Sequence, residues 1–147
     1  MYWAQALAAQ TEDKELQAHF APIAKALTEN EQKIVAEFKA VQGKPADIGG
    51  YFMPDQAKFK AVMCPSTTLN DILKKASSDP RWANVFAITE EPLVSSDILG
   101  NSHASIADLA MTRVVGGNLV KIMGWYDNEM GYTNTLVDHV IKTAKFI

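Results

Sequence analysis

Cysteine is almost absent from this sequence: Cys64 is the only one in 147 residues. A single thiol excludes a disulfide within the chain and a zinc site built from several cysteines, although a link between two chains stays open. Such sparse use of cysteine fits a reducing compartment. No apolar run approaches the roughly 18 to 20 residues of a membrane span, and the segment "MYWAQALAAQ" lacks the basic lead and cleavage site of a signal peptide. We therefore expect a cytoplasmic protein with no membrane partner.

The chain also lacks an excess of positive charge. Its 14 Lys and Arg residues stand against 17 Asp and Glu residues, which gives a formal net charge of −3. The basic residues form no block and do not alternate with aromatic residues, as they would along a nucleic-acid-binding surface. We expect no nucleic-acid partner.

A glycine-rich phosphate-binding loop is missing as well. A dinucleotide-binding fold carries Gly-x-Gly-x-x-Gly directly after a strand. The glycine pairs of this chain stand in "GGY" and "GGNL", which are the wrong settings for that motif. The sequence thus contains no nucleotide-binding fold of this type.

The first half of the sequence has helical periodicity instead. The segment "MYWAQALAAQ" is apolar enough for the buried end of a helix, and Thr11 is a candidate cap for the acidic segment that follows. Pro22 should interrupt that helix, because a proline inside a helix loses a hydrogen bond and clashes with the preceding turn. We place Pro22 in the first turn of a new helix. The apolar residues of this new helix recur at helical spacing: Ile23, Leu27, Ile34, Phe38 and Val41.

Two shorter helices are expected next. One follows Pro54 in "PDQAKFKAVM". Cys64 precedes a proline, which disfavours helical geometry at that cysteine. Ser66 can then cap the second helix. The apolar residues of this helix follow the i, i+3, i+4, i+7 pattern: Leu69, Ile72, Leu73 and Ala76.

The character of the sequence changes after about Trp82. The segments "NVFAIT", "ASIADLAM" and "RVVGGNLVKIMGWY" carry β-branched and alternating apolar residues, which predict antiparallel strands. Gly116, Gly117 and Asn118 form a candidate hairpin turn between two of these strands.

An amphipathic helix should close the chain, with Asp127 or Asn128 as its cap. Its apolar residues are Leu136, Val137, Val140, Ile141 and Ala144. The predicted fold class is α+β, in which a helical N-terminal half is followed by a small antiparallel sheet and a closing C-terminal helix.

The stretch "YWAQALAAQTEDKELQAHFAPIAKALTENEQKIVAEFKAVQGKPADIGGYFMPD", together with "MCPSTTLNDIL", carries a specific resemblance. These residues, about 2 to 73, closely resemble the C-terminus of the monomeric NADP-dependent isocitrate dehydrogenases. That family usually has arginine before "PS", where this chain has Cys64.

The remaining residues, about 74 to 145, resemble a different family. The stretch "ITEEPLVSSDILGNSHASIADLAMTRVVGGNLVKIMGWYDNEMGYTNTLVDHVIKTAK" is similar to the last part of phosphorylating glyceraldehyde-3-phosphate dehydrogenase. The tryptophan that this family usually has before "GY" is here Met130. Since the two families have unrelated folds, the chain resembles a chimera joined near "LNDILKKAS". We divide it into a helical segment, residues 1–73, and a strand-rich segment with its helix, residues 74–147, which either share one core or fold separately.

The second resemblance implies a cofactor contact at two positions. Asn128 matches the family position that binds the nicotinamide carboxamide, and Tyr132 matches a neighbour of that ring. Each needs the missing domain to present a cofactor, so we expect no bound cofactor, with weak residual binding of NAD or NADP as the alternative. The simpler interpretation makes Asn128 a helix cap and Tyr132 a packing residue.

We expect no catalytic residue. Cys64 stands in "MCPSTTLN", which is similar to the "SCTTN" nucleophile motif of the second family, and a cysteine before a helix can have a lowered pKa. It lies in the other segment, however, and has an inserted proline. A reactive thiol also needs an oriented histidine, and the three histidines have no recognisable relation to Cys64: His19, His103 and His139. An unreactive thiol is therefore the expectation.

We expect no metal site either. Asp47 and Asp55 flank a glycine turn, but two isolated carboxylates fall short of a magnesium and tricarboxylate site. Solvated turn residues are the better interpretation.

Three functions remain open. The chain is a recombined, designed or computed sequence without dehydrogenase activity, a module that binds NAD or NADP weakly through Asn128 and Tyr132, or an interaction protein. The last follows because both segments normally pack against the rest of their enzymes, so that the isolated pieces should expose apolar surface and form a homo-oligomer.

Overall fold

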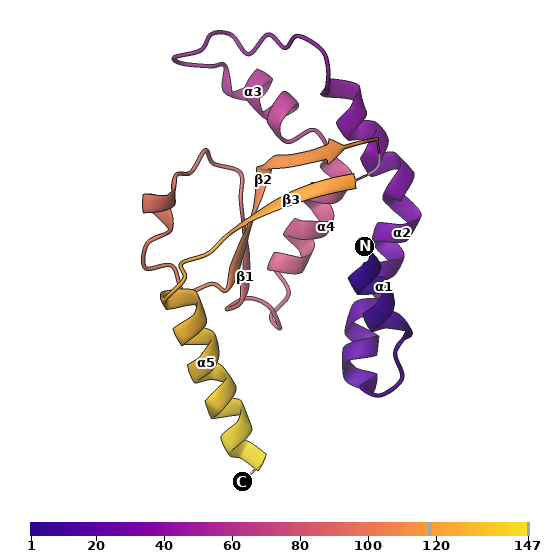
Figure 1. Cartoon of the computed structure of the whole chain (residues 1–147), viewed down its shortest axis with the longest axis vertical. Helices are drawn as coiled ribbons and strands as arrows, with labels where there is room; N and C mark the ends of the chain where they lie inside the picture. The colour runs from indigo at the N-terminus through magenta and orange to yellow at the C-terminus, as the bar shows by residue number, and fades with distance from the viewer. Residues whose placement is uncertain (118, 147) are drawn as a thin grey trace.

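The computed structural model describes residues 1–117 and 119–146. Within these residues the chain forms five α-helices, three strands and two short 3-10 helices (Figure 1). In chain order the elements are α1 (Tyr2–Ala9), α2 (Lys14–Val41), α3 (Gln56–Met63), α4 (Thr67–Ser77), β1 (Phe86–Thr89), η1 (Ser95–Ile98), β2 (Ser105–Val115), β3 (Leu119–Trp125), α5 (Met130–Thr143) and η2 (Ala144–Phe146).

Helices α1 and α2 form an antiparallel hairpin at one side of the molecule (Figure 1). The cap of α2 is Asp13, whose Oδ1 accepts a hydrogen bond from the Leu16 N–H at 2.8 Å. The prediction of Thr11 as the cap was therefore wrong, since the carboxylate lies directly before the first helical residue. The prediction that α1 is buried was also wrong: Tyr2 and Trp3 are exposed, and only Ala4 is buried.

Pro22 lies inside α2 rather than at the start of a new helix. The prediction of a break was wrong because a helix of 28 residues packs along α1 and α4, and this contact outweighs one missing hydrogen bond. The missing N–H would have bonded the carbonyl of Ala18, which is an exposed residue, so water can take its place.

Local signals place α3 and α4 correctly. The Asp55 carboxylate accepts from the Lys58 N–H at 2.9 Å and caps α3. Cys64 ends α3 with φ −121° and ψ 55°, which confirms that the residue before Pro65 is not helical. The Ser66 hydroxyl accepts from the Leu69 N–H at 3.1 Å, which confirms its prediction as the cap of α4.

The three strands form one sheet in the order β1, β2, β3. Strands β2 and β3 are antiparallel, as predicted, but β1 runs parallel to β2, with Phe86 opposite Ser105. The sheet is thus mixed. A parallel pair needs a connection of about a dozen residues or more that returns the chain to the same end. Residues 90–104, with η1 inside them, provide this return.

A tight turn joins β2 and β3. Val115 pairs with Leu119, and the glycines between them have φ values of +60° at Gly116 and +96° at Gly117, which favour glycine. The hairpin prediction is confirmed for these two residues, whereas Asn118 lies outside the described residues.

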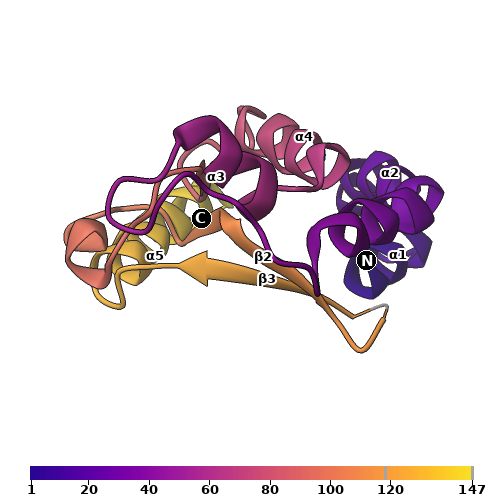
Figure 2. The same ribbon diagram turned by 90° about the horizontal axis from the view of Figure 1, so that it is seen from above.

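The main core cluster contains side chains of the helical half, and side chains of the sheet pack against it. Phe38, which is 1% exposed, packs with Ile34 and Leu69. Val114 and Val120, from β2 and β3, pack against this cluster. Figure 2 shows α3 and α4 on one side of the strands and α1 and α2 beyond the hairpin end of the sheet.

The α+β fold class is confirmed, with a helical first half and a helix after the sheet. Helix α5 leaves the end of β3 and extends away from the sheet and the other helices (Figure 1). Among the described residues, none of the helices combines the length and the apolar character required to cross a lipid bilayer.

Candidate functional site

The turn between β3 and α5 and the first turn of α5 carry the residues for which a cofactor role was predicted. Asp127 organises this turn: its Oδ1 accepts from the N–H groups of Glu129 and Met130, both at 2.8 Å, and its Oδ2 accepts from the Gly100 N–H at 2.8 Å. Backbone hydrogen bonds from Met130, Gly100 and Glu129 lower the pKa of this carboxyl. The N-cap position of α5 is Glu129, which has no side-chain cap, and the Asp127 carboxylate supplies the acceptor for the first helical N–H in its place.

Asn128 and Tyr132 both lie on the surface of this turn and helix. Asn128 is exposed, and Tyr132 is 67% exposed. Helix α5 approaches the preceding loop at Gly131, where an added Cβ would lie 2.7 Å from the His103 carbonyl oxygen. The close approach fixes the start of α5 against that loop. Neither of the two cavities described for the molecule is lined by Asn128 or Tyr132.

The thiol of Cys64 is buried, with 7% of the residue exposed. Burial raises the pKa of this thiol, and the nearby Glu90 carboxylate raises it further. The backbone carbonyl of Cys64 accepts a hydrogen bond from the Asn70 side chain at 3.3 Å. A thiol in this setting is a poor nucleophile at neutral pH, because only the thiolate attacks.

Near Cys64, the Glu90 carboxylate forms ion pairs with two lysines. Its carboxylate lies 2.7 Å from Lys74 Nζ and 2.9 Å from Lys60 Nζ. The hydrogen bonds from Lys74 and Lys60 lower the pKa of Glu90, and the same contact raises the pKa of Lys60. The cluster ties α3 and α4 to the end of β1.

The histidines take part in other contacts. His103 places Nδ1 2.9 Å from Asn101 Oδ1 and Nε2 3.1 Å from the Ala83 carbonyl oxygen. His19 lies 3.9 Å from Glu15 along α2, and His139 is exposed on α5. The structure thus brings no histidine of these elements into a hydrogen bond with the thiol of Cys64.

The two aspartates considered as metal ligands have local roles. Asp47 accepts from the Gly49 N–H at 2.9 Å and pairs with Lys58, whose hydrogen bond lowers the pKa of Asp47. Asp55 caps α3. In the residues that the structure describes, no group of three or more histidine, cysteine, aspartate or glutamate side chains is arranged to hold a metal ion.

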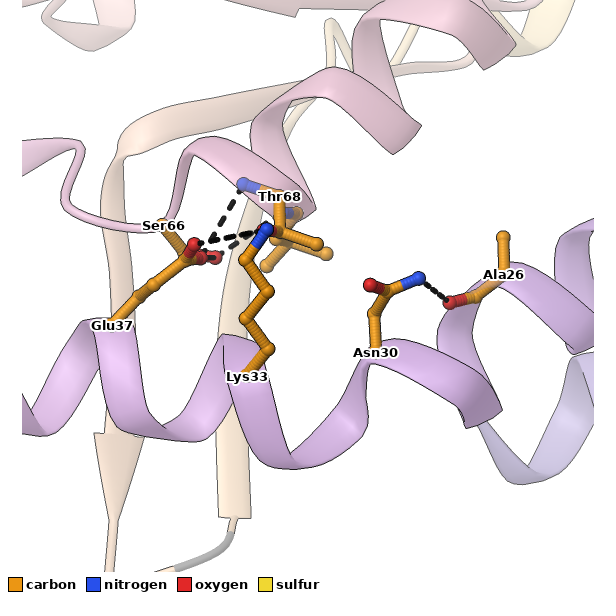
Figure 3. Close-up of polar contacts among 7 residues, drawn as sticks. Ala26, Asn30, Lys33, Glu37, Ser66 and Thr68 are labelled. Atoms are coloured by element: carbon orange, nitrogen blue, oxygen red, sulfur yellow. Dashed lines mark hydrogen bonds and ion pairs between the residues drawn. The ribbon is translucent and has the colours of Figure 1, made fainter.

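The sequence analysis missed Glu37, which joins α2 to the start of α4 (Figure 3). Its carboxylate accepts from the Ser66 hydroxyl at 2.7 Å, the Thr68 hydroxyl at 2.8 Å and the Thr68 N–H at 3.3 Å. Burial alone would raise the pKa of Glu37, but these hydrogen bonds and Lys33, 4.0 Å away, hold it below its usual value. The partners are about thirty residues apart in sequence, so no local pattern could reveal the contact.

Asp108 forms a second buried contact that the sequence did not reveal. It is 2% exposed on β2, and its carboxylate accepts from the Trp125 Nε1 at 2.7 Å and from the Ala110 N–H at 3.0 Å. These bonds lie beside an irregularity in the pairing of β2 with β3. Asp108 therefore stabilises the sheet where its register shifts.

The larger cavity is apolar and measures ≈ 380 Å³. Helices α1, α2 and α4 and strand β3 line it, and Glu31 is its only charged side chain. A cavity with this lining offers few groups that could orient a polar substrate.

Apolar residues are exposed on α5 and, separately, on β3. Four residues of α5 are between 46% and 58% exposed: Leu136, Val137, Val140 and Ile141. Leu119, Ile122 and Met123 of β3 are exposed as well. Large exposed apolar patches on soluble proteins often mark interaction sites, and the four neighbouring residues of α5 form one apolar face of that helix.

Comparison with known proteins divides the chain in two. The family described as monomeric isocitrate dehydrogenase matches residues 1–74, and the family described as glyceraldehyde 3-phosphate dehydrogenase, C-terminal domain, matches residues 61–128. Both predicted resemblances are thereby confirmed, and residues 61–74 fit both families.

Individual relatives give the same division. An NADP-dependent isocitrate dehydrogenase of Azotobacter vinelandii is 62% identical over 73 residues, which are 50% of this chain and 10% of that enzyme. One from Mycobacterium tuberculosis is 57% identical over 74 residues, again 50% of this chain and 10% of the enzyme. A glyceraldehyde-3-phosphate dehydrogenase of Borreliella burgdorferi is 47% identical over 77 residues, which are 52% of this chain and 23% of the enzyme. The chain thus spans a tenth to a quarter of the relatives it matches.

Proposed function

The chain belongs to the monomeric isocitrate dehydrogenase family through residues 1–74, and on this premise we propose that it has no dehydrogenase activity of its own and acts as a self-associating interaction module. The observation that carries the proposal is the exposed apolar face of α5, together with the exposed apolar residues of β3. Burying this face against a second copy would remove apolar surface from water, which is the main driving force of association. The partner that we propose is a second copy of this chain.

The absence of activity is supported by the share of each enzyme that is present. The chain spans 10% of the first isocitrate dehydrogenase and 23% of the glyceraldehyde-3-phosphate dehydrogenase. Its cysteine is buried with a raised pKa, which argues against a nucleophile.

We place the junction within residues 61–74, where the two family matches overlap, and propose an origin by recombination. The scarcity of cysteine leads us to keep the cytoplasm as the proposed location.

The test combines turnover and mass. The purified chain is assayed with isocitrate and NADP and with glyceraldehyde-3-phosphate, phosphate and NAD, and its mass is measured by sedimentation from low to high micromolar concentration. The proposal predicts no turnover above a blank and a mass that rises with concentration. Turnover with either substrate, or a monomer at every concentration, would contradict it.

A weak dinucleotide-binding module is the second candidate. The exposed side chains of Asn128 and Tyr132, on a turn that Asp127 holds in place, favour it. Titration with NAD and NADP, followed by Tyr132 and tryptophan fluorescence, tests it. Saturable binding that an Asn128→Ala change weakens would support this candidate, and binding that the change leaves untouched would remove its basis.

A further inference from the structure

Strand β3 is an open edge of the sheet. It lies at the end of the strand order, and among residues 1–117 and 119–146 its one pairing partner is β2. Figure 2 shows it along the outer margin of the molecule. The other edge strand, β1, is shorter, half-buried and packed against α4. An edge strand presents unpaired N–H and C=O groups that accept another strand.

The backbone direction of β3 can be established near its end. The Ser105 N–H donates to the Val85 carbonyl at 3.1 Å, so this residue of β2 faces β1. Because backbone groups alternate along a strand, Ile106 faces β3, where Trp125 lies opposite it. The next residue of β3, Gly124, therefore directs its N–H and C=O away from β2, towards the open edge.

An independent contact gives the same direction near the start of β3. With its amide oriented to satisfy both groups, Gln42 donates to the Val114 carbonyl at 2.9 Å and accepts from the Val114 N–H at 3.1 Å. Both backbone groups of Val114 therefore bond to the side chain of Gln42, the residue that follows α2, and not to β3. Val120 lies opposite Val114, so Val120 also directs its backbone groups to the open edge. Ile122, midway between Val120 and Gly124, follows the same alternation.

We infer that β3 pairs antiparallel with β3 of a second copy across a two-fold axis at Ile122, which joins two three-stranded sheets into one. This inference rests on the proposed self-association and names its surface. In this register Ile122 faces its own copy, and Val120 faces Gly124 of the other chain. Every outward-facing residue is then matched, with about six hydrogen bonds between the chains.

The side chains select this register over its neighbours. Lys121 is the only charged residue of β3, and here it lies opposite Met123 of the other chain. An axis at Lys121 would place two ammonium groups directly opposite each other, which is unfavourable. An axis at Met123 would leave Val120 opposite a residue beyond the strand. At the centre, Ile122 is 46% exposed and apolar, so contact with its copy removes apolar surface from water.

The first experiment measures mass by sedimentation for the wild-type chain, three variants and a mixture of two of them. Ile122→Lys and Ile122→Glu each place like charges across the axis, and we expect at least about a tenfold weaker dimer in each case. An equimolar mixture of the two should recover the dimer, because opposite charges then meet. Met111→Lys, at a position of β2 that is 42% exposed, is the matched control and should leave the dimer intact.

The outcomes separate the inference from the proposed function. A wild-type chain that stays at 16.1 kDa at all concentrations would overturn both. A wild-type dimer that both Ile122 variants retain, or that their mixture fails to restore, would overturn the β3 pairing alone.

The second experiment needs no substitution. Amide hydrogen exchange of the wild-type chain is followed by NMR at low and high concentration. The N–H groups of Val120, Ile122 and Gly124 should exchange more slowly at high concentration, as they become hydrogen-bonded between chains. Equal rates at both concentrations would overturn the inference.

Discussion

At the scale of single residues, two carboxylates hold segments together that the sequence separates. Glu37 links α2 to the first turn of α4, and Asp127 links the start of α5 to the loop at Gly100. Both have a lowered pKa, because each accepts several hydrogen bonds in its charged form. The two sites make distinct predictions.

Replacing Glu37 with glutamine should destabilise the fold by about 1 to 2 kcal/mol at neutral pH, since charge-assisted hydrogen bonds are lost. The pKa of Glu37 is lower in the folded state than its ordinary value of 4.5. Its contribution is therefore fully present above pH 4.5 and lost as the pH falls through the folded-state pKa. Urea unfolding at a series of pH values checks this: the difference between wild type and Glu37→Gln should shrink below pH 4.5. Glu31→Gln, on the exposed face of the same helix, is the control and should show little difference at any pH.

Replacing Asp127 with alanine should loosen the start of α5. The N–H groups of Gly100, Glu129 and Met130 lose their acceptor, so their hydrogen exchange should accelerate and the melting temperature should fall. Asn128→Ala is the matched neighbour and should change neither quantity. If the two variants behave alike, Asp127 is not the residue that organises this turn.

Residue roles could be predicted from the sequence only where the partner is close along the chain. Ser66 caps the helix that begins beside it, and Gly116 and Gly117 form the turn between adjacent strands. Glu37 and Asp108 bond to partners brought near by the fold, so their roles have no local signature.

At the scale of elements, propensity and packing conflict in α2. Pro22 disfavours the helix, yet the helix continues through it because its faces are packed against α1 and α4. Strand β1 likewise depends on distant residues: its parallel pairing with β2 is set by the long connection through residues 90–104 and not by its own four residues. Helix and strand positions were therefore predictable from periodicity, whereas continuity and strand direction were set by tertiary contacts.

Replacing Pro22 with alanine should stabilise the protein by about 1 to 3 kcal/mol, because it restores a helical hydrogen bond and removes the clash with the preceding turn. Pro54→Ala, just before the cap of α3, should instead be neutral or slightly destabilising, since that proline breaks no hydrogen bond of the helix. Urea unfolding of both variants provides the comparison. A destabilised Pro22→Ala would mean that the proline itself shapes the α2 packing.

At the scale of the whole molecule, the main question is how two unrelated pieces form one structure. The cluster around Phe38 contains residues of α2 and α4, and Val114 and Val120 of the second segment pack against it. We propose that both segments fold as one unit around this cluster. The sequence could locate the two segments, but it could not show that they pack together. These contacts join segments that resemble two different families, so neither resemblance predicts them.

Replacing Phe38 with alanine tests the shared core. The loss of this buried side chain should cost about 3 to 5 kcal/mol. If the segments fold together, far-UV circular dichroism of the helices should report the same shifted transition as the fluorescence of Trp125 on β3, which is measured with Trp3 and Trp82 replaced by phenylalanine. A shift in the helical signal alone would show that the segments unfold separately.

The most direct test of the account is differential scanning calorimetry of the wild-type chain at several concentrations, with and without excess NAD and NADP. We predict one transition, a melting temperature that rises with protein concentration because a self-associated fold is stabilised by mass action, and no response to either dinucleotide. Two transitions would contradict a shared core, and a concentration-independent melting temperature would contradict self-association. An increase with dinucleotide would mean that a cofactor site has survived in this chain.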